Sequence, residues 1–209
     1  MKHFLLVAIA IALFFPANSQ SSESFSDKKN EINIGFFNAF ELSNVSDFGI
    51  GYKRMTNKGA WRFGTSFGLR DYKTDYENTN ISSSTFNYLS LTPRIGYEWH
   101  QNFNRLQLQY GTDLTAGFYR NKTEDVDNIT DYYRLRETIR NTYSIRPFLG
   151  LTVFISNSIS LSTETYLNIG YSHQTVEESY NSTSSSQSTE KGSSVSLGPL
   201  GVFSINIHF

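Results

Sequence analysis

The chain has 209 residues, the size of one domain, and its 18 basic and 19 acidic residues nearly cancel. This balance gives no electrostatic reason to expect nucleic acid as a partner. No cysteine is present, which excludes disulfide bonds, thiolate metal ligands and a cysteine nucleophile. Aromatic residues are 15% of the chain, with 17 Phe and 13 Tyr, and this composition favours β-strands.

The first 19 residues have the organisation of a secretory signal peptide. Lys2 and His3 precede an apolar run over 4–15, and small residues follow it before Gln20. The run is shorter than the ~20 residues that a membrane-spanning helix needs. Residues 20–30 are polar and are interpreted as a flexible lead. The remaining chain, 31–209, is expected to form one domain.

Alternating apolar and polar residues recur through that domain, which is the periodicity of β-strands. The pattern predicts eight strands, at about 31–42, 47–56, 60–72, 86–100, 105–119, 142–155, 158–172 and 194–209. A helical turn within 123–139 is an open possibility. Short turns near residues 57, 103 and 157 alternate with long polar segments at 73–85, 120–141 and 173–193. This alternation is typical of up-and-down membrane barrels, which have short turns at one end and longer loops at the other.

The two faces of these strands differ in a way that indicates which one is inside. Glycines fall on the polar face, where they would make room for large side chains inside a narrow barrel. An arginine turned toward lipid near the midplane would cost roughly 2–4 kcal/mol. The prediction is therefore a polar, packed lumen with ion pairs such as Arg94 with Asp113 and Arg146 with Glu164. The residues expected in these pairs are Arg62, Arg94, Glu98, Asp113, Arg146 and Glu164.

Aromatic residues gather near the predicted strand ends, as interfacial girdles require. Trp61, Tyr97 and Trp99 lie beside the short turns, and Tyr143 and Tyr171 lie near the long loops. Tyr72, Phe86 and Tyr119 are also counted with the second group. Ordinary aromatic-rich strands would explain the number of these residues but not their placement.

The chain resembles the small outer-membrane β-barrel proteins of Gram-negative bacteria, the OmpA-like and OmpX-like superfamily, over about 31–209. The resemblance rests on the signal peptide, the eight alternating strands and the C-terminal sequence VFSINIHF. In that family the barrel-assembly machinery recognises a last strand with outward apolar residues and a terminal aromatic. The residues that match this signal are Phe203, Ile205, Ile207 and Phe209. The implied fold is an eight-stranded antiparallel up-and-down transmembrane β-barrel.

The implied function is that of a monomeric outer-membrane protein with a structural, adhesion or other interaction role. Its expected partners are outer-membrane lipid and lipopolysaccharide, the barrel-assembly machinery, and an external macromolecule at loops 73–85, 120–141 and 173–193. No cofactor is expected. A metal is not expected either, because the acidic segment 124–131 lacks the glycine of a calcium loop. The alternatives are a narrow, porin-like channel and a soluble, secreted, lipocalin-like binding barrel.

A third alternative is a lipid-modifying enzyme at the outer rim, because some members of the family use Ser, His and a carboxylate there. His173 is the one histidine near that rim, close to Ser172, Glu177, Glu178 and Ser179. A nucleophile needs a base within hydrogen-bond reach and a group that orients the base. The sequence has no His-x-Ser spacing, and His173 opens a predicted loop. We therefore expect no catalysis.

Overall fold

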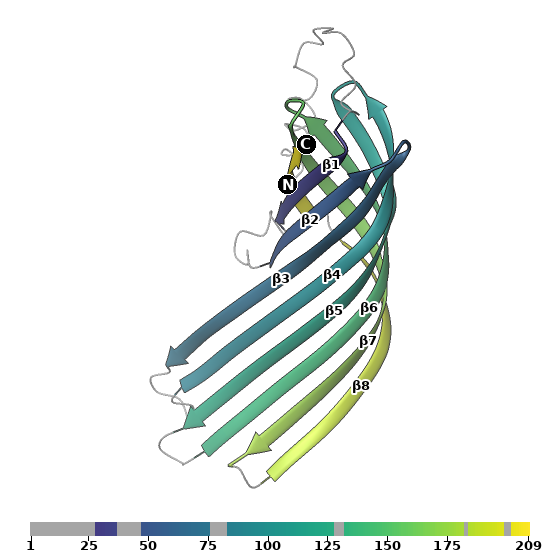
Figure 1. Cartoon of the computed structure of the whole chain (residues 1–209). Helices are drawn as coiled ribbons and strands as arrows, with labels where there is room; N and C mark the ends of the chain where they lie inside the picture. The colour runs from purple at the N-terminus through teal and green to yellow at the C-terminus, as the bar shows by residue number, and fades with distance from the viewer. Residues whose placement is uncertain (1–27, 37–46, 76–82, 128–131, 182–183, 199–201) are drawn as a thin grey trace, which may run out of the picture.

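The computed structural model describes residues 28–36, 47–75, 83–127, 132–181, 184–198 and 202–209. Within these ranges the chain forms nine antiparallel β-strands and no helix (Figure 1). The strands are β1 (Asn30–Phe36), β2 (Asp47–Met55), β3 (Gly59–Asp75), β4 (Ser83–Phe103), β5 (Leu106–Asp127), β6 (Tyr132–Phe154), β7 (Ile159–Tyr180), β8 (Ser184–Leu197) and β9 (Val202–His208). No helix long and apolar enough to cross a membrane is found among the described residues.

The nine strands form one sheet that closes on itself. Each strand from β1 to β7 pairs with the strand that follows it, and β9 lies between β1 and the first part of β7. Pairing of Ile34 with Ile205, and of Leu161 with the same Ile205, closes the ring. The domain is therefore barrel-like, as the sequence predicts, with nine separate strands in the described part of the chain.

The last predicted strand, 194–209, corresponds to the end of β8 and to β9. β8 pairs with β7 from Leu167 outward, whereas β9 pairs with β7 up to Glu164. Between these segments Gly198 N donates a hydrogen bond to Tyr166 O at 2.7 Å. The two strands thus follow successive parts of the same edge of β7.

The three long predicted loops are mostly strand, which corrects the sequence interpretation. Residues 73–75, 83–85, 120–127, 132–141, 173–180 and 184–193 extend β3 to β8. The possible helical turn within 123–139 is also wrong where that segment is described, because β5 and β6 occupy it up to Asp127 and from Tyr132. The short turns are as predicted, and Asn104 turns the chain between β4 and β5 with a φ of 53°.

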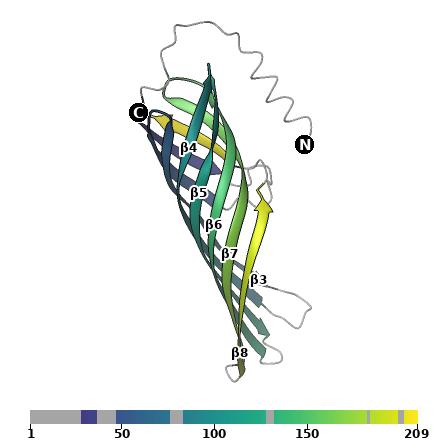
Figure 2. The ribbon, with the colours of Figure 1, turned by 90° about the vertical axis from the view of Figure 1, so that its right-hand side faces the viewer.

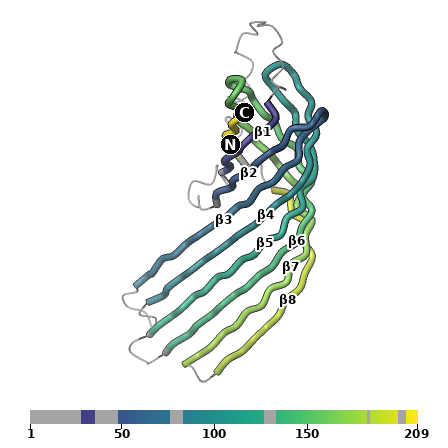
Figure 3. Tube along the Cα trace, in the orientation of Figure 1, coloured from purple at the N-terminus to yellow at the C-terminus, as the bar shows by residue number. Residues whose placement is uncertain are grey.

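The extensions make the molecule asymmetric. β1 and β2 have 7 and 9 residues, whereas β3 to β8 have between 14 and 23. Beyond the pair Asp47 and Gly68, β3 continues with β4 as its only partner among the described strands. Strands β3 to β8 therefore project beyond the ring as one curved sheet, which the ribbon and the tube trace both show (Figures 1, 2 and 3). We call this projecting part the open wall.

Burial is inverted relative to a water-soluble protein. Large apolar side chains point outward and remain about half exposed in the ring, as Ile95 (46%), Leu149 (51%) and Ile207 (49%) illustrate. The described part of the interior buries only Ala60, Phe148, Phe154 and Val176 among apolar residues. Its most buried large side chains are instead polar, and Glu98 and Gln109 have no exposed surface. The ring thus has a polar core and an apolar exterior, as the distribution of residues predicts.

Glycine on the inner face makes this polar core possible. A Cβ atom at Gly150 would lie 2.7 Å from Gln109 Nε2 and 2.9 Å from Glu164 Cγ. Contacts this short essentially never occur, so any side chain at this position would displace the buried polar groups. The prediction that glycines make space on the inner face is correct at this position.

Candidate functional site

The centre of the ring is an ion-pair network built around Arg62 of β3. Its guanidinium lies 3.0 Å from Glu98 Oε2, 3.0 Å from Glu164 Oε2 and 3.4 Å from Asp113 Oδ1. These carboxylates come from β4, β7 and β5, so one side chain connects four strands. The Arg62 guanidinium also lies 3.9 Å from the centre of the Phe148 ring. Buried charges persist when they are paired in this way.

Lys53 of β2 extends the network toward the short-turn end. Its Nζ lies 3.2 Å from Glu31 and 3.0 Å from Glu98, and it donates a hydrogen bond to Gln109 Oε1 at 3.3 Å. Gln109 Nε2 in turn donates to Glu164 Oε1 at 3.2 Å. The amide therefore bridges a cation and an anion, which the alternating pattern alone did not reveal. Together with His100, 2.7 Å from Glu98, these groups fill the ring with fixed contacts.

Two predicted pairings are wrong. Asp113 and Glu164 both pair with Arg62, and neither pairs with Arg94 or Arg146. Arg146 Nε donates instead to Asn168 Oδ1 at 3.1 Å, and its guanidinium lies 4.7 Å from the centre of the Tyr166 ring. Within the described residues, Arg94 makes no ion pair, and its Nε lies 2.9 Å from where a Cβ of Gly64 would be. Arg94 and Arg146 thus lie beyond the network, at the mouth of the ring.

The C-terminal strand has the predicted orientation. Ile205, Ile207 and Phe209 point outward, with exposures of 41%, 49% and 51%, whereas Ser204, Asn206 and His208 are buried. Phe203 lies on the same face as Ile205 and is half-buried. Inside, Asn206 Nδ2 donates to Ser160 Oγ at 3.0 Å and to Ser162 Oγ at 3.1 Å. These bonds tie β9 to β7 and complete the closure of the ring.

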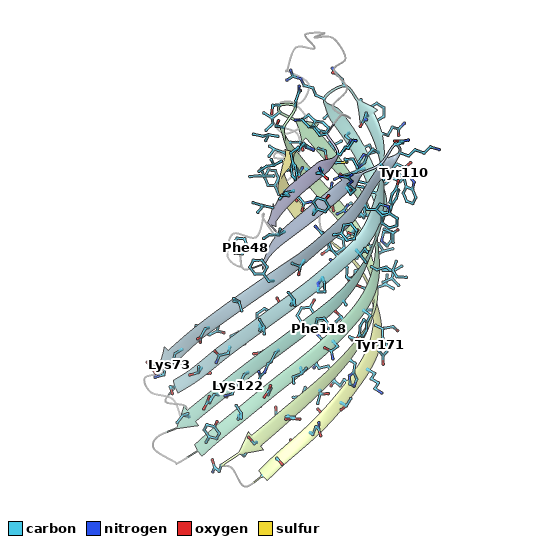
Figure 4. All side chains as sticks on the ribbon, viewed as in Figure 1. Phe48, Lys73, Tyr110, Phe118, Lys122 and Tyr171 are labelled. Carbon is cyan, nitrogen blue, oxygen red and sulfur yellow. The ribbon has the colours of Figure 1, made fainter. Side chains whose placement is uncertain are left out.

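Outward aromatics form a continuous cluster near the short turns. Tyr97 lies 5.2 Å from Trp61 and 5.1 Å from Trp99 between ring centres, and Trp99 lies 5.9 Å from Tyr110. Figure 4 labels Tyr110 in this region. Toward the open wall, Tyr143 of β6 faces Tyr171 of β7 in register, and both are about half exposed. All five predicted girdle residues therefore lie on the outer face.

Three other aromatic residues, which were expected on the outer face, lie on the inner face. Tyr72, Phe86 and Tyr119 share the inner face with Arg70 and Tyr88, as the strand registers show. They cannot belong to an outward girdle. The sequence interpretation was wrong because it used closeness to a strand end and not the parity of each position.

The alternatives at the rim receive no support from the geometry. His173 lies on the outer face of β7 and makes no side-chain hydrogen bond among the described residues, whereas Ser172 points inward and donates to Gly192 O at 3.4 Å. The two side chains therefore do not form a nucleophile and base pair. Groups of three or more His, Asp or Glu residues suited to a metal do not occur among the residues that the structure describes. Of the acidic segment, Asp131 lies outside those residues.

Ionisable groups on the open wall have their own network. Glu178 of β7 accepts hydrogen bonds from Tyr180 Oη at 3.0 Å and Arg134 Nη2 at 3.2 Å. Arg136 Nε also lies 3.2 Å from Glu178 Oε1. The hydrogen bonds from Tyr180 and Arg134 lower the pKa of Glu178 below its ordinary value. The carboxylate thus organises two arginines on the inner face of this wall.

On the open wall there is a shallow hollow of about 430 Å³. Most of its lining residues have outer-face positions, namely Leu69, Asp71, Asn87, Leu89, Arg120 and Lys122, and the inner-face residues Arg70 and Tyr88 complete the lining. Arg120 pairs with Glu137, and Lys122 lies 3.5 Å from Glu124. Figure 4 labels Lys73 and Lys122 on this projecting part. The mixture of paired charges next to leucines is typical of a boundary between an apolar belt and water.

Comparison with known proteins supports the fold. No protein-family model and no curated protein sequence matches the chain. A crystal structure of a major outer membrane protein from Thermus thermophilus superposes with a TM-score of 0.52 at 12% sequence identity, over 88% of this chain and 100% of that chain. A second structure, Acinetobacter baumannii CarO, has a TM-score of 0.39 at 13% identity, over 87% of this chain and 97% of that chain. The first of these neighbours, a major outer membrane protein, shares the overall fold of this chain.

Proposed function

We propose that the chain is an integral outer-membrane protein whose ring is an eight-stranded barrel, with β8 and β9 as two parts of its last strand. The observation that carries this proposal is the inverted burial: apolar side chains cover the outside, and Arg62, Glu98 and Glu164 are buried at the centre. In water this exterior would drive aggregation, whereas lipid solvates it. Closure leaves the ring no unpaired edge, so one copy suffices in a membrane.

In this arrangement the short turns and the junction of β1 with β9 face the periplasm, and the open wall extends outside the cell. Outer-membrane barrels have short turns on the periplasmic side and longer connections outside. The barrel-assembly machinery would act on β9, whose outward residues end in Phe209. The open wall then carries the structural or adhesive role, because segments held by a rigid scaffold commonly carry function.

A narrow channel is a weaker alternative. Its path would cross the ion pairs of Lys53 on β2 and Arg62 on β3, which reach four other strands of the ring, β1, β4, β5 and β7. A small barrel has an interior just wide enough for its side chains. The full chain in planar bilayers should therefore show no steady conductance. Stepwise conductance that Arg62→Met increases would favour the channel instead.

Cell fractionation tests the proposal directly. The full-length protein should sediment with the outer membrane and should change its mobility on a denaturing gel after boiling, because a folded barrel resists detergent at room temperature. As a control, Ile95→Arg places a charge in the apolar belt at a cost of roughly 2–4 kcal/mol and should reduce the folded fraction. Recovery of the unaltered protein in the soluble periplasmic or secreted fraction would contradict the proposal and favour a soluble binding barrel.

A further inference from the structure

The inner face of the open wall carries aromatic and arginine side chains that are needed neither to pack the ring nor to contact lipid. Cross-strand registers align Arg70 with Tyr88 and with Asn121, and this face continues the inner face of the ring. Beyond the ring, however, no described strand stands opposite this face, and the ribbon in two views shows the wall curving alone (Figures 1 and 2). Most side chains on this face therefore border water, whereas Val176 of β7 is buried at 8% exposure.

Aromatic rings are exposed on this water-facing side. Tyr72 of β3 stacks on Phe86 of β4 with ring centres 4.9 Å apart and an angle of 25° between planes, yet Tyr72 is 54% exposed. Tyr119 and Tyr180 continue the aromatic surface on β5 and β7, and both are half-buried. A lipid girdle needs aromatics on the other face. Folding of an open sheet does not require large flat rings to remain in water, so these rings are available to stack on a ligand.

On the inner face of the open wall, the positively charged side chains of the described strands are arginines. Arg70 lies 5.9 Å from the Tyr88 ring centre, Arg140 lies 4.8 Å from that of Tyr119, and Arg134 lies 5.8 Å from that of Tyr180. Arg140 makes no ion pair among the described residues, and Arg136 has a side chain that is 50% exposed. A guanidinium that stacks on a ring keeps its N–H groups at its edge, where they can bind an anion in bidentate fashion.

Charge is distributed unevenly along the inner surface. Within the ring, the network of Lys53 and Arg62 holds four carboxylates, those of Glu31, Glu98, Asp113 and Glu164. From the mouth outward the described inner-face residues include six arginines and three carboxylates. These residues are Arg70, Arg94, Arg134, Arg136, Arg140, Arg146, Asp125, Glu178 and Glu190. An anion is therefore attracted to the wall and repelled from the centre of the ring.

We propose that the inner face of the open wall binds an acidic polysaccharide. Sugar rings stack on the Tyr72 and Phe86 pair and on Tyr119, and the guanidinium groups of Arg136 and Arg140 bind the carboxylate or sulfate groups of the polymer. From β3 to β7 the surface crosses four strand spacings, roughly 19 Å, which suits an extended polymer better than a small anion. The inference rests on the proposed function, because the wall must lie outside the membrane to meet such a ligand.

Binding of polygalacturonate to the full-length protein, folded in detergent micelles, tests this inference. We expect the double variant Arg136→Gln/Arg140→Gln to weaken binding at least tenfold. The matched control Arg120→Gln/Lys122→Gln removes two positive charges from the outer face and should change affinity less than twofold. Tyr72→Leu should weaken binding severalfold, whereas Leu69→Ala, on the outer face of the same strand, should have no effect. Neutral dextran should bind much more weakly than polygalacturonate.

Several results would overturn the inference. These are no binding of polygalacturonate, equal losses in the inner-face and outer-face double variants, or binding that Tyr72→Leu leaves unchanged. Poly-glutamate that binds as tightly as polygalacturonate would instead indicate an acidic protein as the partner. Each variant must show the same boiling-dependent gel shift as the unaltered protein. A protein that fractionates with the outer membrane but binds no polygalacturonate contradicts this inference alone, whereas a soluble protein contradicts the proposed function.

Discussion

The first residue of β1 and the last residue of the chain bond to each other through both of their backbone groups. Asn30 N donates to Phe209 O at 3.1 Å, and Phe209 N donates to Asn30 O at 3.0 Å. An open edge of this sheet would leave such groups without partners, which is costly in lipid. These two bonds continue the pairing of β1 with β9 as far as Phe209 and help to close the ring.

Deletion of Phe209 should destabilise the folded protein by about 1–3 kcal/mol, since each lost hydrogen bond contributes about 0.5–1.5 kcal/mol. Phe209→Ala keeps both backbone bonds and should cost less in urea unfolding of the protein in vesicles. If the aromatic ring is also the assembly signal, both variants should accumulate less in the outer membrane of cells. An unchanged unfolding free energy for the deletion would contradict the closure account.

Arg62→Met should be among the most destabilising substitutions, by about 3–5 kcal/mol, because it leaves Glu98, Asp113 and Glu164 buried without their shared cation. Adding Glu164→Gln to that variant should restore part of the loss. The control is Lys73→Met, which breaks an exposed pair with Asp75 and should change stability by less than about 1 kcal/mol. Chemical unfolding in vesicles measures all three, and similar losses at Arg62 and Lys73 would refute the role of the network.

Gly150→Val should cost about 1–3 kcal/mol, because a side chain there collides with Gln109 and Glu164. The matched control is Gly192→Ala on the open wall, where a Cβ meets no atom within 4 Å. That control should lie within about 0.5 kcal/mol of the unaltered protein. Equal effects at the two glycines would mean that the interior is not packed as described.

Protonation of Glu178 should loosen the outer part of β6 and β7. The pKa of this carboxyl is lower in the folded wall, so its contribution to stability is present above the ordinary glutamate pKa, about 4.3. That contribution is lost as the pH falls through the lowered pKa. After correction for intrinsic exchange rates, amide hydrogen exchange of 134–136 and 178–180 should be faster at pH 3 than at pH 7. Glu178→Gln should remove most of this difference, and an unaltered difference in that variant would contradict the assignment.

The sequence predicted the ring well because the physical signal there is strong. Each strand of the ring separates a polar interior from an apolar exterior. Apolar residues such as Ile95 and Leu149 therefore alternate with polar or glycine positions along their strands. The sequence predicted only the end of β8, from residue 194 onward, and assigned the rest of it to a loop; all residues of Ser184–Leu197 are exposed. A strand with water on both faces has no apolar periodicity, and its extent is set by pairing with β7.

The partners in the ion pairs were also not predictable from local sequence patterns. Cross-strand neighbours can be inferred from a hairpin, which led to the expected pair of Arg94 with Asp113. Arg62 of β3 instead reaches Glu164 of β7, 102 residues away, across the ring. Such contacts depend on the diameter of the closed sheet and on the space that Gly150 leaves, and neither follows from the register of one hairpin.

The central claim is that lipid contacts the apolar outer face while the polar face is enclosed. A carbene probe confined to the bilayer, applied to the full-length protein in vesicles and followed by mass spectrometry, tests this claim most directly. We expect labelling of Ile95 and Leu149, which are about half exposed, and protection of Thr92 and Glu98, which are buried inside. Labelling of Thr92 and Glu98 with protection of Ile95 and Leu149 would contradict it.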